Sequence, residues 1–171
     1  MRNSHVKKFG VLITGAVMAV AIAAPALAWV PGRMTGGGSI IKPNGLRVTH
    51  GFVLHCSLEG QAPDGPNSLE INWLGGDTEN NFHLTDLTFA ACRDADGYEE
   101  EMPEAGFDTM RGAGTGSLNG DDGYTIKFFI TDQGEPGTAD RLRFAIYDSS
   151  GDRVFRAAGV LVFGNHQALP A

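Results

Sequence analysis

Residues 112–130 read GAGTGSLNGDDGYTIKFFI, and this segment has the clearest strand pattern of the chain. Residues 124–130 alternate between buried-type apolar side chains and a second set that includes Thr125 and Lys127, which is the two-residue period of a strand with one buried face. The preceding part has glycine at every second position from Gly112 to Gly116. The sequence therefore predicts a β-hairpin in which bulky side chains lie across the bare backbone of a glycine-rich strand.

The length of the turn predicts the register of this hairpin. A turn over residues 119–123 places Leu118 opposite Tyr124. The pairs that follow are Gly116 with Ile126, Gly114 with Phe128 and Gly112 with Ile130. Core packing is the favoured explanation of the glycine strip, and close approach of a ligand over flat backbone is the alternative.

The same alternation recurs along the chain, and no long segment after residue 28 has a helical period. Alternating runs occupy residues 46–56, 69–73, 82–89, 142–146 and 155–163. A change of phase near Thr85 and Asp86 predicts a β-bulge. We expect one domain over residues 37–168, an all-β antiparallel sandwich of immunoglobulin-like or jelly-roll type with about seven to nine strands. Residues 29–36 are expected to form a flexible N-terminal segment.

Residues 1–28 have the pattern of an export signal. Arg2, Lys7 and Lys8 precede an apolar run over residues 11–24. The small side chains at positions 26 and 28 then predict cleavage between Ala28 and Trp29. We expect a secreted or periplasmic protein with no transmembrane anchor after removal of the signal.

Charge and cysteine content limit the partners and the compartment. After residue 28 the chain keeps ten basic and all 20 acidic residues, a net charge of −10. This balance argues against nucleic acid and anionic lipid, which both require a basic surface, and leaves divalent cations open. Cys56 and Cys92 are expected to form a disulfide in an exported protein. A reactive thiol beside His55 is the alternative.

Four segments together form a recognisable pattern: GAGTGSLNG at 112–120, GYT at 123–125, TDQGEPGTAD at 131–140 and AGVLVFGNHQ at 158–167. The pattern resembles the secreted bacterial domains of the post-COAP-1 type, over about residues 36–167. The resemblance implies a β-rich extracellular module without an established activity, found alone or beside other surface domains. This chain departs from the family at His166, where an apolar residue is frequent, and in an acidic loop over residues 94–104.

The candidate binding site is the segment from Asp132 to Asp140. Asp132, Glu135 and Asp140 bracket a Pro-Gly turn, and carboxylate oxygens around a tight loop suit calcium. The simpler interpretation is that these carboxylates accept hydrogen bonds from turn amides and shape the connection between two strands. Calcium is the one cofactor for which the sequence offers ligands, and it remains an open alternative.

The sequence offers no catalytic set. There is no Gly-x-Ser-x-Gly elbow and no zinc motif, and His50, His55, His83 and His166 are each expected to be packed or surface side chains. We therefore expect a non-catalytic exported structural or interaction module, with an unknown protein or glycan at the cell surface as partner. A calcium-assisted carbohydrate- or protein-binding domain is the alternative, and an exported hydrolase is a weaker one. Phe129, on the face opposite to its apolar neighbours, is either a packing residue of a second layer or an exposed contact.

Overall fold

The computed structural model describes residues 30–58, 60–61, 65–95 and 105–171. Within these ranges the chain forms nine β-strands and no helix. The predicted signal, its cleavage site at Ala28 and Trp29, and most of the acidic loop lie outside the described residues. The strands are β1 (Gly32–Ile41), β2 (Arg47–Cys56), β3 (Ser68–Gly75), β4 (Thr78–Arg93), β5 (Thr109–Leu118), β6 (Asp121–Thr131), β7 (Arg141–Tyr147), β8 (Arg153–Val160) and β9 (Phe163–Pro170).

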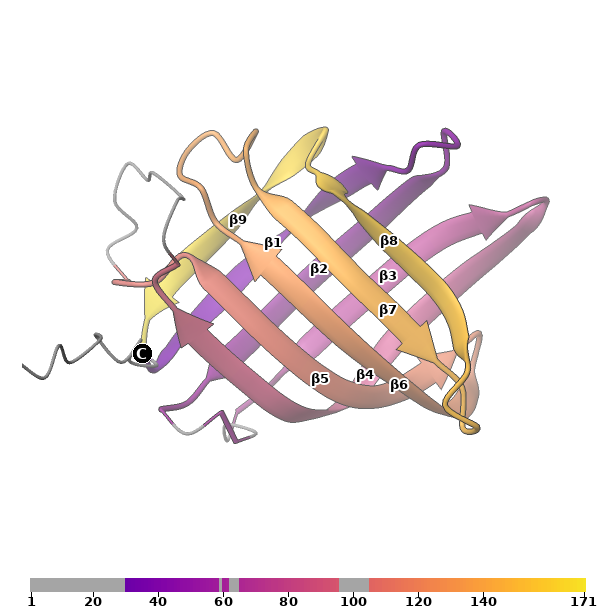
Figure 1. Cartoon of the computed structure of the whole chain (residues 1–171), viewed down its shortest axis with the longest axis horizontal. Coiled ribbons are helices and arrows are strands. Elements are labelled where there is room, and N and C mark those ends of the chain that lie inside the picture. The colour runs from indigo at the N-terminus through magenta and orange to yellow at the C-terminus, as the bar shows by residue number, and fades with distance from the viewer. Residues whose placement is uncertain (1–29, 59, 62–64, 96–104) are drawn as a thin grey trace, which may run out of the picture.

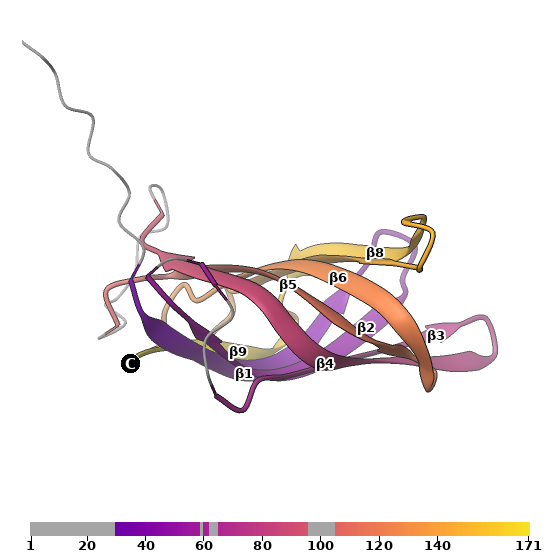
Figure 2. The ribbon, with the colours of Figure 1, turned by 90° about the horizontal axis from the view of Figure 1, so that it is seen from below.

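All nine strands belong to one antiparallel sheet in the order β8-β7-β6-β5-β4-β3-β2-β1-β9. The sheet curls strongly into a half-barrel, so that strands β5–β8 cross in front of β1–β3 and β9 (Figure 1). Figure 2 shows the two halves of the curled sheet facing one another. The all-β antiparallel prediction is confirmed. A sandwich of two separate sheets is not confirmed, because every described strand belongs to the same hydrogen-bonded sheet.

The longest strand, β4, carries the irregularities that let the sheet curl. Its pairing with β5 shifts between Leu84 and Asp86, and again between Leu87 and Phe89. A bulge adds a residue to one strand, bends it and increases its twist. The bulge predicted from the change of apolar phase near Thr85 and Asp86 is therefore present, and a second one follows it.

The β5–β6 hairpin exists as predicted, but its register differs by two residues. Asn119 and Gly120 have φ values of 56° and 89°, which is the geometry of a two-residue type I′ turn. Leu118 therefore pairs with Asp121, and a register shift next to it brings Gly116 opposite Tyr124. The predicted pairing was wrong because it assumed a five-residue turn over residues 119–123.

Packing explains the glycine strip in β5. Gly112 pairs with Phe128, and the ring of Phe128 occupies the position that a Cβ atom on Gly112 would need. A Cβ on Gly114 would likewise meet the backbone oxygen of Asp86. Bulky side chains thus lie against bare backbone, as expected for the core-packing interpretation.

The core lies between the two halves of the curled sheet. Trp73 of β3 stacks on Phe155 of β8, with ring centroids 3.9 Å apart and ring planes 4° from parallel. The predicted disulfide is present between Cys56 of β2 and Cys92 of β4, with a Cα–Cα distance of 5.8 Å. It links two strands that flank β3 and closes a loop of 36 residues, which stabilises the fold by about 4 kcal/mol on the chain-entropy model.

Two other expectations need correction. Residues 32–36 begin β1 and pair with both β2 and β9, so they are not part of a flexible segment. The run over residues 155–163 is not one strand, because β8 ends at Val160 and β9 begins at Phe163. Between β8 and β9, the backbone N–H of Val162 donates to the carbonyl oxygen of Ser39. The side chain of Phe163 is exposed rather than buried.

The glycine strip gives a test of this packing. We expect Gly112→Ala to lower the free energy of unfolding by about 1–3 kcal/mol, because the new methyl group overlaps the Phe128 ring. Gly51→Ala is the control, since nothing lies within 4 Å of its Cβ position in β2. Urea unfolding of both variants measures the difference. Equal stability of the two variants would contradict the register described here.

Candidate functional site: a basic pocket on the outer face of the sheet

The predicted carboxylates lie together in the connection between β6 and β7, and all three reach β9. Asp132 Oδ2 accepts the backbone N–H of Ala168, and Asp140 Oδ2 accepts that of His166, both at 2.7 Å. Glu135 Oε1 accepts the side-chain amides of Asn165 at 2.7 Å and Gln167 at 3.4 Å. The carboxylates therefore cover the edge of β9 that does not pair with β1.

The remaining oxygens of the two aspartates hold the turn itself. Asp132 Oδ1 accepts the N–H of Gly134, and Asp140 Oδ1 accepts the N–H of Gln133. All four oxygens of these buried side chains thus accept backbone hydrogen bonds. This geometry gives the carboxylates a structural role, and calcium binding stays a prediction.

A buried histidine pair lies beside these carboxylates. His50 Nε2 and His166 Nε2 are 2.7 Å apart, and His166 Nδ1 lies 2.8 Å from the carbonyl oxygen of Thr131. A carbonyl only accepts, so His166 Nδ1 carries the proton and its Nε2 accepts from His50. His50 Nδ1 is then unprotonated, and it is buried without a hydrogen-bond partner in the described structure.

Burial sets the charge state of this cluster. Desolvation, together with the nearby His166, lowers the pKa of His50 to about 3. Desolvation also lowers the pKa of His166 to about 4, although its bond to Thr131 acts in the opposite direction. For Asp140, desolvation raises the pKa to about 6 against the effect of its two backbone hydrogen bonds. The pair is therefore neutral at pH 7, as the tautomer assignment requires.

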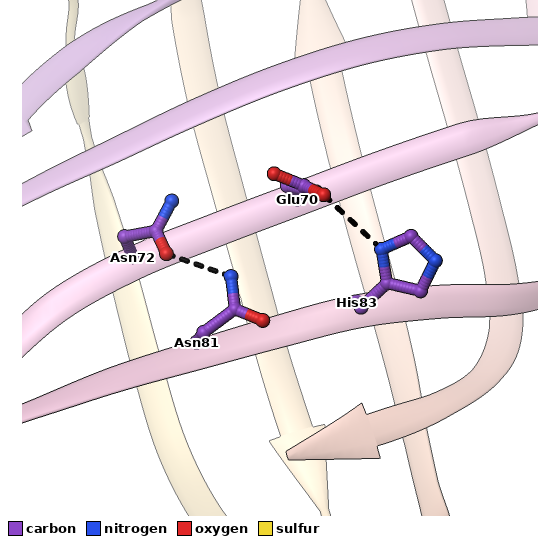
Figure 3. A network of polar contacts seen from close by, with 4 residues as sticks. All are labelled: Glu70, Asn72, Asn81 and His83. Atoms are coloured by element: carbon purple, nitrogen blue, oxygen red, sulfur yellow. Dashed lines mark hydrogen bonds and ion pairs between the residues drawn. The ribbon is translucent and has the colours of Figure 1, made fainter. Parts of the chain in front are cut away.

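The other two histidines have structural partners. The backbone N–H of His55 donates a hydrogen bond of 2.8 Å to the side-chain oxygen of Asn67. His83 Nδ1 lies 3.3 Å from Glu70 on the exposed face of β3 and β4 (Figure 3). Asn81 and Asn72 form a neighbouring bond of 2.7 Å across the same two strands (Figure 3).

A pocket of about 660 Å³ is lined by strands β5–β8 and by Lys42 and Pro43 of the connection between β1 and β2. Six basic side chains line it, and with Phe129, Ala145 and Ala158 we call this set the basic pocket: Lys42, Arg111, Lys127, Arg143, Arg153 and Arg156. They are six of the ten basic residues that follow residue 28. Among the described residues, no acidic side chain contributes to this lining, although the chain has 20 of them.

Strand register brings these cations together. One cross-strand row runs Arg111, Phe129, Arg143 and Ala158, from β5 to β8. The next row runs Ala113, Lys127, Ala145 and Arg156. The intervening residues of each strand point into the core, so the long basic side chains are left on the outer face.

Aromatic rings hold several of the cations. The guanidinium carbons of Arg111 and Arg143 lie 5.6 and 5.1 Å from the centroid of Phe129. Lys42 Nζ lies 4.6 Å from the centroid of Phe155. Phe129 is therefore neither a packing residue of a second layer nor a free contact, because it positions two guanidinium groups by cation–π attraction.

Among the described residues, these charges have no paired counter-charge. Within the described ranges, none of the six basic side chains forms an ion pair with an aspartate or glutamate. Clustered like charges repel one another, and guanidinium groups bind carboxylate, sulfate and phosphate oxygens with paired hydrogen bonds. The arrangement is thus suited to binding an anion.

Sequence reasoning missed this pocket because it summed the charge over the chain. A net charge of −10 argues against nucleic acid and anionic lipid, but it averages a basic face with acidic loops and turns. The available signal was the outward position of Lys127, Arg143 and Arg156 on three successive alternating runs. The strand order and register were needed to show that these positions are neighbours.

Removal of one edge-covering carboxylate tests the structural role. We expect Asp132→Ala to lower the free energy of unfolding by about 3 kcal/mol in the presence of a chelator, because two backbone N–H groups lose a charged acceptor. Asp148→Ala is the control, since Asp148 accepts two N–H groups within an exposed turn. Destabilisation that appears only when calcium is present would instead assign the carboxylates to a metal.

The histidine pair predicts a dependence of stability on pH. The pKa of His50 is lower in the folded state than its usual 6.5, so the unfolded chain takes up the proton first as the pH falls. His50 alone then removes about 2 kcal/mol of stability between pH 7.5 and pH 5. The pKa of Asp140 is raised in the folded state, so this group favours folding as the pH falls. All the variants keep Asp140, and its contribution therefore cancels when their losses of stability are compared.

We expect His50→Gln to show a correspondingly smaller loss of stability over this range, because glutamine donates a hydrogen bond without titrating. Urea unfolding at the two pH values measures it. His83→Gln is the control, because it removes an exposed histidine. A loss equal to that of the unchanged protein would contradict the buried neutral pair.

Among the described residues there is no helix long and apolar enough to cross a membrane. No protein family, no curated protein and no solved structure matches the chain.

Proposed function

We propose that the protein is an exported, non-catalytic interaction module that binds an anionic ligand in the basic pocket. The observation that carries this proposal is the convergence of six cations in one pocket, none of them in an ion pair within the part of the chain that the structure describes. The chain has twice as many acidic as basic residues after residue 28. An anion would offset the repulsion between these cations without any change in the sheet.

Export is supported by two independent features. Residues 1–28 have the composition of a signal peptide, and the disulfide between Cys56 and Cys92 is compatible with an oxidising compartment. The secreted post-COAP-1-type domains that the sequence resembles would fit the same location. In this proposal the facing halves of the sheet act as the two layers of a sandwich would: one carries the pocket and the other backs it.

The non-catalytic character is supported by the placement of the perturbed groups. His50, His166 and Asp140 have shifted pKa values, but they are buried. The two histidine rings are hydrogen-bonded to each other, and Asp140 accepts the backbone N–H of His166. The side chains of the basic pocket are lysines and arginines, which suit ion binding. A calcium-assisted binding domain remains the alternative, with Asp132, Glu135 and Asp140 as ligands.

Chromatography on dextran sulfate, compared with neutral dextran, tests anion binding. We expect retention on the sulfated resin alone, with earlier elution of an Arg111→Gln/Arg143→Gln variant in a salt gradient, because two unpaired guanidinium groups are lost. Arg33→Gln/Arg47→Gln is the matched control: it removes the same charge at exposed positions outside the pocket. Equal loss of retention in both variants, or no retention at all, would contradict the proposal.

A further inference from the structure

We infer that the ligand of the basic pocket is a short acidic oligosaccharide, with carboxylate or sulfate groups separated by uncharged sugar faces. This inference rests on the proposed function, because it names the ligand class of the same pocket. It depends on two features of the pocket, the spacing of its cations and its small apolar side chains. It also depends on the acidic character of the rest of the chain.

The cations are spread out rather than focused on one point. Arg111 and Arg143 stand on either side of Phe129, and Lys127 and Arg156 stand on either side of Ala145. Adjacent strands are about 4.8 Å apart, so the two cations of each row are attached to backbones roughly 10 Å apart. Several separated anionic groups fit this spacing, whereas a single phosphate requires donors that converge on it.

The surface between the cations is apolar and low. Ala145 and Ala158 are small side chains of the lining on the outer face. Ala145 lies between Lys127 and Arg156, and Ala158 lies beside Arg143 on the edge strand β8. A sugar ring has C–H groups on its faces and polar groups around its rim. Such a ring can lie on the alanine methyl groups while charged substituents at its rim reach the flanking guanidinium groups.

The remaining surface limits the length of the ligand. Outside the pocket, four basic and 20 acidic residues remain after residue 28. A long polyanion that extended past the pocket would meet this negative charge, so a short one is favoured.

Single-stranded nucleic acid also needs free aromatic faces for its bases. Phe129, the outward aromatic side chain of the described lining, is instead flanked by two guanidinium groups.

Isothermal titration calorimetry with defined probes tests the inference. The probes are a hyaluronan tetrasaccharide, which carries carboxylates alone, a chondroitin sulfate tetrasaccharide, neutral chitotetraose, a tetraglutamate peptide and an eight-residue oligothymidylate. We expect at least one acidic tetrasaccharide to bind about tenfold more tightly than the three other probes at the same ionic strength. Comparison of the two acidic sugars distinguishes carboxylate from sulfate recognition.

Variants tie the binding to the pocket. We expect Arg143→Gln/Arg156→Gln to weaken the preferred tetrasaccharide by about tenfold or more, because both rows lose a cation. The control Arg33→Gln/Arg47→Gln should change it by less than about twofold, since only long-range attraction is lost. Thermal melting verifies that both variants are folded.

The outcomes separate the two proposals. Binding of tetraglutamate or oligothymidylate as tight as that of the sugars overturns the oligosaccharide inference and leaves anion binding intact. Binding of the acidic sugars that is unchanged in Arg143→Gln/Arg156→Gln overturns the assignment to this pocket. Absence of binding to every anionic probe, together with no retention on dextran sulfate, overturns the proposed function itself.

Discussion

The structure depends on how the edge strands of its single sheet are covered. A sheet with free edges exposes unpaired N–H groups, which favour pairing with other chains. Here β8 and β9 are the edge strands, and they are consecutive in the chain. Asp132 and Asp140 accept the N–H groups that β9 leaves unpaired, so a loop from the opposite half covers this edge.

This edge arrangement also explains the buried polar cluster. His166 donates its own N–H to Asp140, and its ring bridges Thr131 and His50. The cluster therefore connects β9 with β2 and with the end of β6. Burial is the largest cause of its pKa shifts, and its members are hydrogen-bonded to one another. The proposed binding surface lies elsewhere, on the outer face of β5–β8, where five of the six basic side chains are exposed.

The sequence predicted the elements more reliably than their arrangement. Alternation in runs such as 124–130 gave the strands, the phase change near Asp86 gave a bulge, and Cys56 and Cys92 were paired correctly. Register was less accessible, because the tight Asn119-Gly120 turn and the register shift beside it moved the pairs from Gly116 to Gly112 by two residues. The single sheet places β1 beside β9, a pairing between distant segments that no local pattern encodes. The basic pocket depends on the exact register between the neighbouring strands β5–β8, which alternation alone does not give.

The pairing of β1 with β9 has a consequence for biogenesis. Of the described strands, β1 comes first in the chain, and it needs β9, the ninth, to complete one of its two ladders. Until β9 has been synthesised, one side of β1 is unpaired, and long-range pairing of this kind is slow. Glycine at positions 36 and 38 leaves room for this closing strand, because a Cβ atom at either position would meet the backbone of β9.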